Sequence, residues 1–218
     1  RDRWGRTWLL TRPDFYTEEL WLLPDGAPAL PASSGPGALT EASATVAPGA
    51  VHIDVPASAE ASAVWDWLLV SLREDWETGG AVHRAGSLLA APLEDFLAGG
   101  RDLETLFAPT PSACLVGFTA TARHLVLTLL DDCVAALEVL TPPRGAGGWA
   151  RRPLDLSALA RRGPGAGTDV RPDAPPDPTA LRPGRPLIEV SAAAVDGREG
   201  DRLWLTTSSF TRPTTLMA

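Results

Sequence analysis

The stretch RTWLLTRPDFYTEELWLL, residues 6–23, consists of an apolar segment, a polar break and a second apolar segment. Three later stretches repeat this order: WDWLLVSLREDW from Trp65, RHLVLTLLDDCVAALEVL from Arg123 and RLWLTTSSFTRPTTLMA from Arg202. Their apolar segments are short, rich in Trp, Leu, Val and Thr, and bounded by turn residues, which favours strands over helices. Each block therefore predicts a β-hairpin. The four hairpins are expected near residues 6–23, 65–92, 123–141 and 202–218.

The four blocks recur at long, nearly regular intervals. Aligned positions lie 59 residues apart from Trp8 to Trp67, 58 from Trp67 to Leu125 and 79 from Leu125 to Trp204. We expect these four side chains to be mostly buried. Weaker strand candidates precede three of the hairpins, at residues 50–56, 114–120 and 186–194.

Each repeat thus offers three or four antiparallel strands, which is typical of a β-propeller blade. The predicted fold class is all-β, a partial β-propeller of about four blades made of antiparallel sheets. Two packed β-sandwiches remain the alternative.

Two segments depart from the repeat. PLEDFLAGG, residues 92–100, has Pro at a first-turn position, acidic residues after it and Gly at its end, which predicts one or two helical turns. The longest interval contains a Pro/Gly/Arg-rich stretch at about residues 142–186. We expect it to be a long surface insertion, mobile around residues 161–178, in a domain that spans residues 1–218.

The composition excludes some partners. The chain has no Lys, Asn or Gln, its 19 basic residues are all Arg, and its formal net charge is −8. Because no basic stripe is present, we expect neither a nucleic-acid partner nor a membrane partner. No apolar run is long enough for a transmembrane helix. Cys114 and Cys133 are too few for a disulfide scaffold and are interpreted as reduced, buried thiols of a cytoplasmic protein.

The sequence contains only poor matches to catalytic and metal-binding motifs. Ser87 follows a glycine but lacks the second glycine of a G-x-S-x-G elbow, so it is not expected to be a nucleophile. His52, His83 and His124 lie 31 and 41 residues apart, without the short spacing of a zinc site. We interpret them as ordinary partly buried or exposed histidines.

The remaining candidate functional residues have similarly simple structural interpretations. Asp131 and Asp132 follow an apolar strand and are expected to accept backbone N–H bonds in a turn. RRGPGAG, residues 161–167, lacks the GK[ST] ending of a phosphate loop. Trp149 stands in a Gly/Arg-rich loop, where it is either a surface residue or a contact to a neighbouring domain. We therefore predict no catalytic, cofactor-binding or metal-binding residue in this chain, and no cofactor.

The order and spacing of four segments resemble bacterial prolyl oligopeptidases, serine peptidases of the S9 type. These segments are RPDFYTEELWLL, the block from Trp65 to Gly99, the block from Arg101 to Leu140, and DRLWLTTSSFTRPTTLMA. The similarity is greatest to the seven-bladed propeller of that family, and it is weakest at residues 24–50 and 144–185. The closing TSSFTRPTTL is similar to the last-blade sequence of the family, after which an α/β-hydrolase domain normally follows.

The resemblance implies the later part of a propeller, without the catalytic α/β-hydrolase domain. That domain would be the partner that supplies Ser, His and Asp, and short proline-containing peptides would be the substrates. The propeller would cover the active site and admit short peptides for cleavage after proline, while this chain alone would be inactive. A non-catalytic propeller that serves as a protein-interaction module is the alternative function.

Overall fold

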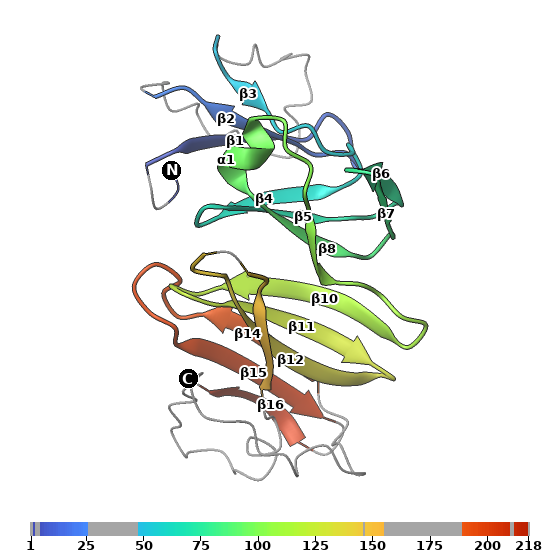
Figure 1. The fold of residues 1–218 in the computed structure, drawn as a ribbon. Helices are drawn as coiled ribbons and strands as arrows, with labels where there is room; N and C mark the ends of the chain where they lie inside the picture. The colour runs from blue at the N-terminus through green and yellow to red at the C-terminus, as the bar shows by residue number, and fades with distance from the viewer. Residues whose placement is uncertain are drawn as a thin grey trace. The chain divides into compact units, whose positions relative to one another are not determined.

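The structure is a computed structural model that describes residues 2, 5–25, 48–145, 147–154, 189–209 and 212–217. These residues form sixteen β-strands and one short helix. The strand pairings with a defined register are antiparallel. The prediction of an all-β fold of antiparallel sheets is confirmed, and these sheets are consistent with a partial β-propeller (Figure 1).

The helix is α1 (Leu93–Leu97), and the strands have the following bounds: β1 (Thr7–Thr11), β2 (Glu19–Leu23), β3 (Val51–His52), β4 (Glu60–Val64), β5 (Trp67–Ser71), β6 (Trp76–Thr78), β7 (Ala81–His83), β8 (Leu88–Pro92), β9 (Glu104–Phe107), β10 (Ala113–Ala120), β11 (Leu125–Asp131), β12 (Val134–Thr141), β13 (Ala150–Leu154), β14 (Glu189–Ala194), β15 (Leu203–Ser209) and β16 (Arg212–Met217). The sheet orders are β1-β2-β3, β4-β5-β8-β9, β6-β7, β10-β11-β12-β13 and β14-β15-β16.

All four predicted hairpins are present. β1 pairs with β2, β11 with β12, and β15 with β16, while β5 and β8 are neighbours in their sheet. The predicted polar break between β5 and β8 contains a small hairpin of its own, β6-β7. Its connecting residues, Gly79 and Gly80, have φ of +59° and +76°. Two successive positive φ values are typical of the tight turn that joins twisted strands, and glycine adopts them without a steric penalty.

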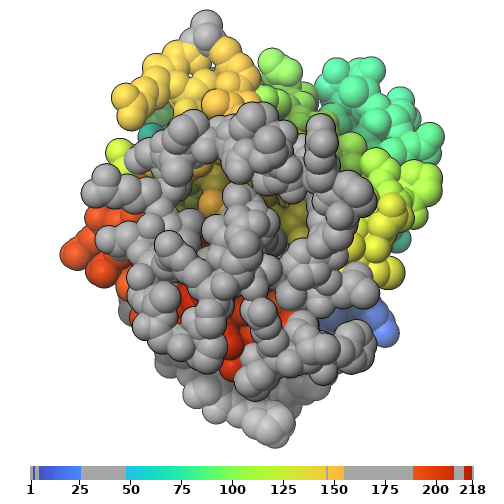
Figure 2. All heavy atoms as spheres, turned by 90° about the horizontal axis from the view of Figure 1, so that it is seen from below, coloured from blue at the N-terminus to red at the C-terminus, as the bar shows by residue number. Residues whose placement is uncertain are grey.

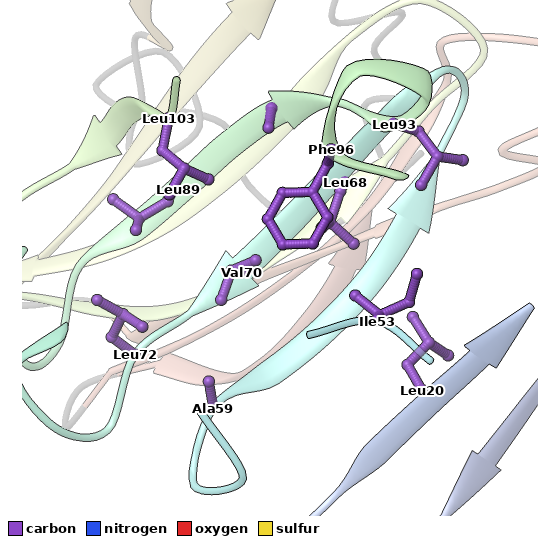
Figure 3. Close-up of a cluster of buried hydrophobic side chains, with 11 residues drawn as sticks. Leu20, Ile53, Ala59, Leu68, Val70, Leu72, Leu89, Leu93, Phe96 and Leu103 are labelled. Atoms are coloured by element: carbon purple, nitrogen blue, oxygen red, sulfur yellow. The ribbon is translucent and has the colours of Figure 1, made fainter. Parts of the chain in front are cut away.

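The chain forms two compact units, which we describe separately. The first comprises residues 1–83 and 89–103, and the second comprises residues 84–88 and 104–218. In the first unit, α1 provides Leu93 and Phe96 to the core, which confirms the helical turns predicted for residues 92–100. Figure 3 shows the Phe96 ring beside Leu68 of β5, within a cluster that also contains Leu20 and Ile53.

The core of the second unit joins two of its sheets. Val126 of β11 and Leu137 and Val139 of β12 pack against Val190 of β14 and Leu205 of β15. All five side chains are at most 4% exposed. Because β-strand side chains alternate between faces, each of these strands turns one face toward this core and the other face away from it.

The burial expected at the aligned positions is only partly correct. Leu125 is fully buried, and Trp8 and Trp67 are half-buried, but Trp204 is 40% exposed. Trp204 precedes the buried Leu205 on β15, so its side chain lies on the opposite face of the sheet. The same face carries Leu216, which is 61% exposed and lies across from Thr206. The alignment located the strand correctly but did not identify which face is covered.

This exposed apolar pair predicts self-association of the purified 218-residue chain. In Figure 2, atoms of residues 189–209 and 212–217 (red) are visible from this side. We expect replacement of Trp204 and Leu216 by threonine to lower the apparent mass in sedimentation, because contiguous apolar surface promotes association. Val82→Thr, at a 59% exposed position in β7, is the matched control and should leave the apparent mass unchanged. A monomeric unmodified chain with one sharp, reversible unfolding transition would contradict the prediction.

The proposed insertion falls largely outside the described residues. Its first part contains β13 (Ala150–Leu154), which pairs with β12 as the fourth strand of a sheet. Residues 155–188, including the segment around residues 161–178, are not described. The strand expected at residues 186–194 is present as β14 from Glu189 onward.

Candidate functional site

Ser87 does not have the surroundings of a nucleophile. Its side chain is 2% exposed, and its backbone N–H donates to the carbonyl of Arg84 in the turn that leads into β8. The preceding Gly86 has φ of +83°, and a Cβ at this position would lie 3.3 Å from the Pro109 side chain. The glycine and serine therefore shape a compact turn before a buried strand.

The three histidines have separate structural surroundings, and His124 is buried rather than partly buried or exposed as expected. His52 is exposed on β3, with its ring centroid 4.5 Å from that of Trp21. His83 is half-buried at the end of β7, across from Trp76. His124 is 9% exposed, and its Nδ1 lies 2.8 Å from Oγ1 of Thr141. Within the described part of the chain, no group of three His, Cys, Asp or Glu side chains could hold a metal ion.

Asp131 and Asp132 lie at the predicted turn, Asp131 as the last residue of β11 and Asp132 as the first residue after it. Asp132 and Cys133 have φ of +47° and +61°, the two left-handed residues of a tight β11–β12 connection. Asp131 Oδ1 accepts a hydrogen bond from Oγ of Ser112 at 3.1 Å, and the Asp132 N–H donates to the Ser112 carbonyl. The turn is thus braced by the segment that precedes β10.

The two cysteines are free thiols, but the expectation that they are buried is wrong. Both Cys114 and Cys133 are exposed. Cys133 occupies the turn between β11 and β12, and Cys114 lies near the start of β10, the outer strand of its sheet. Turns and outer strands leave side chains accessible to solvent, which explains both exposures.

Hydrogen bonds to the carboxylate of Asp201 join two segments of the second unit. Asp201 Oδ1 accepts hydrogen bonds from Oγ1 of Thr121 at 2.7 Å and from the backbone N–H of Arg123 at 2.9 Å. Its Oδ2 accepts from Nε of Arg123 at 2.6 Å. Burial raises the pKa of Asp201, but the hydrogen bonds from Thr121 and Arg123 outweigh it and hold the pKa below its ordinary value. These hydrogen bonds connect the β10–β11 turn to the segment that enters β15.

Asp201→Asn should destabilise the chain by about 1–3 kcal/mol at neutral pH, because the amide removes the charge of a largely buried acceptor and its NH2 group cannot accept from Nε of Arg123. The lowered pKa means that this stabilisation is fully present above the unfolded-state pKa and is lost as the pH falls through the folded-state pKa. The difference between the two proteins in urea unfolding should therefore shrink below about pH 4. Asp132→Asn is the control, because Asn also tolerates the left-handed backbone at φ +47°. A difference that is independent of pH would contradict this assignment.

The second unit also contains a cavity of about 900 Å³, which no sequence motif indicated. Its walls come from the middle of β10, the end of β11, the start of β12, and the adjoining parts of β14 and β15. Val116 and Phe118 line one side, and Val190 connects the cavity to the core described above. The lining residues belong to segments up to 92 positions apart, so neither spacing nor periodicity could have identified it.

The remaining candidates from the sequence are Trp149 and residues 161–167. The backbone N–H of Trp149 donates to Oε1 of Glu104 at 2.9 Å, and the Trp149 side chain is half-buried. Residues 161–167 lie outside the described part of the chain. No helix among the described residues is long and apolar enough to cross a membrane.

No family model and no curated protein matches the sequence. Among solved structures, the chain is similar to a post-proline cleaving enzyme from Rickettsia typhi, with a TM-score of 0.66 and 18% sequence identity. The match covers 97% of this chain and 24% of the enzyme's chain, so the present chain spans about a quarter of the enzyme's length. The likeness shows the fold: the chain folds like one part of a post-proline cleaving enzyme.

Proposed function

We propose that this chain is the substrate-gating propeller portion of a prolyl oligopeptidase-like serine peptidase that hydrolyses short peptides after proline. The observation that carries the proposal is the fold likeness to a post-proline cleaving enzyme over 97% of the chain. The repeated hairpins that resemble this family in sequence support it independently. The partner would be an α/β-hydrolase catalytic domain of the same cytoplasmic enzyme.

The proposed role is a size filter. A propeller above an active site admits a flexible peptide of limited length, whereas a folded protein would first have to unfold. Such a filter needs blades that stay packed during turnover. The apolar core around Val190 and Leu205 and the hydrogen bonds of Asp201 supply this rigidity between two sheets of the second unit.

Catalysis is assigned to residues outside this chain. Acyl transfer needs an activated nucleophile, a base within hydrogen-bond reach and an oxyanion hole. Ser87 is buried in a turn, and Nδ1 of His124 lies beside Oγ1 of Thr141.

A fluorophosphonate probe, which labels activated serines, tests the proposal that the catalytic serine lies outside this chain. We expect the complete protein encoded by the gene to cleave a chromogenic proline peptide and to be labelled at a serine outside residues 1–218. The 218-residue chain alone should neither cleave the peptide nor react with the probe. Labelling within these residues, or hydrolysis by the chain alone, would overturn the assignment of catalysis.

A protein-interaction module is the second candidate, and one surface feature favours it. The turn between β1 and β2 presents Phe15 and Tyr16, which are 91% and 72% exposed, with their rings in an edge-to-face contact. Asp14 Oδ1 accepts the backbone N–H groups of Tyr16 and Thr17, which fixes the turn. Exposed aromatic residues on an ordered turn are common in protein interfaces. If the complete protein shows neither hydrolysis nor probe labelling, this second function is favoured.

A further inference from the structure

The cavity of the second unit has the size and the apolar lining of a small-molecule site. Its volume of about 900 Å³ lies at the upper end of the range found for ligand pockets. Val116, Phe118, Leu129 and Leu130 contribute apolar surface to its walls. Val116 is 64% exposed and Leu130 is 36% exposed, so part of this apolar wall faces solvent. Burial of this surface by a ligand would be favourable.

A backbone irregularity contributes to the cavity wall. The pairing of β10 with β11 shifts register between Leu115 and Gly117, which leaves Val116 without a cross-strand partner. A bulge of this kind re-aims a side chain, and here the re-aimed residue lines the cavity. The next residue, Gly117, also lines the cavity, and a Cβ there would meet no atom within 4 Å. The strand thus leaves room where a larger residue would fill it.

The described residues of the cavity wall carry a negative charge. Among the described residues that line it, Glu189 is the one with a charged side chain. Oγ of Ser208, another lining residue, donates to Oε2 of Glu189 at 3.1 Å and so orients the carboxylate. A cationic ligand complements this site, and an anionic one does not.

We propose that this cavity binds an apolar ammonium group, meaning an aromatic or branched aliphatic side chain that carries a primary ammonium ion. The apolar part would lie against Val116, Phe118 and Leu129, and the ammonium would pair with Glu189. A free amine and the N-terminal residue of a short peptide present the same chemistry. The proposal concerns binding by this chain and does not depend on the peptidase assignment.

The two native cysteines make a direct assay possible. Cys133 lines the cavity, whereas Cys114 is exposed and is not among the lining residues, so Cys114 serves as an internal control. Alkylation of each thiol by iodoacetamide is followed by mass spectrometry in the presence of 2-phenylethylammonium, 2-phenylethanol or phenylacetate. We expect the ammonium compound to slow alkylation of Cys133 several-fold without protecting Cys114, and phenylacetate to protect neither. Phenylalanyl-glycinamide, run in parallel, distinguishes the sources: tighter binding than the free amine indicates a peptide N-terminus.

Two variants test the assigned contacts. Glu189→Gln keeps an oxygen that can accept from Ser208 and removes the charge, so affinity for 2-phenylethylammonium should fall about two- to fivefold, with 2-phenylethanol unaffected. Gly117→Leu should abolish protection by filling the cavity, while Gly145→Leu, at another glycine with open space around its Cβ position, should not. Equal protection of both cysteines, no protection of Cys133 in the unmodified chain, or equal effects of the cation and the anion would overturn the proposal.

Discussion

Gly79→Ala should destabilise the chain by about 2–4 kcal/mol, because it combines backbone strain with a clash that cannot easily relax. Gly79 has φ of +59°, and a Cβ at this position would lie 2.2 Å from the carbonyl oxygen of Arg101. That carbonyl belongs to a residue held from several directions. The guanidinium of Arg101 lies 4.2 Å from the centroid of the Phe96 ring, and it pairs with Asp54 at 3.0 Å.

Gly80→Ala is the matched control for this prediction. Gly80 follows Gly79 in the same turn and has φ of +76°, but a Cβ there would meet no atom within 4 Å. Its replacement should therefore cost about 1–2 kcal/mol, from backbone strain alone. Urea unfolding of both variants measures the difference. Equal losses of stability would show that contact with the Arg101 carbonyl does not restrict this turn.

Leu68→Ala should cost about 3–5 kcal/mol, because it leaves a cavity in the core of the first unit. Leu68 is fully buried in β5, and Phe96 of α1 lies beside it (Figure 3). The control is Leu10→Ala in β1, where the side chain is 46% exposed and less apolar surface is lost. That control should cost less than about 1 kcal/mol in the same unfolding experiment. A loss at Leu10 as large as that at Leu68 would contradict the described core.

The strands that could be predicted are those whose sequences contain bulky apolar runs. Leu125–Asp131 and Leu203–Ser209 were located for this reason. β4 and β9 were missed because their sequences, EASAV and ETLF, are short and mix small or polar residues with few bulky ones. β13 was missed because ARRPL has two arginines and a proline, although the outer position in a sheet tolerates both residue types.

The chemistry of the second unit could not be predicted from the sequence, because it depends on contacts between distant segments. Thr121 and Asp201 are 80 residues apart, and neither belongs to a recognisable motif. The bulge at Val116 and the approach of β14 to β10 create the cavity, and both are properties of strand pairing and packing. By contrast, the absence of a serine elbow could be seen in the sequence, because that motif is local.

A cross-link between neighbouring sheets tests the gating role most directly. The backbone N–H of Ala194 in β14 donates to Oγ1 of Thr119 in β10 at 3.3 Å, so these positions lie close together across the two sheets. A Thr119→Cys, Ala194→Cys pair, in the complete protein with Cys114 and Cys133 replaced by serine, would lock the sheets when oxidised. Reduction of the same sample provides the unlocked control. A third sample, the protein with Cys114 and Cys133 replaced by serine but without the new pair, is treated with the same oxidant and controls for oxidation elsewhere.

The decisive measurement is kcat/KM for a dipeptide-sized proline substrate and for a longer proline peptide, before and after oxidation. If the chain is a gate, locking the sheets should slow cleavage of the longer peptide more than that of the shorter one, because a rigid opening restricts the larger substrate first. Equal loss for both substrates would contradict the gating account.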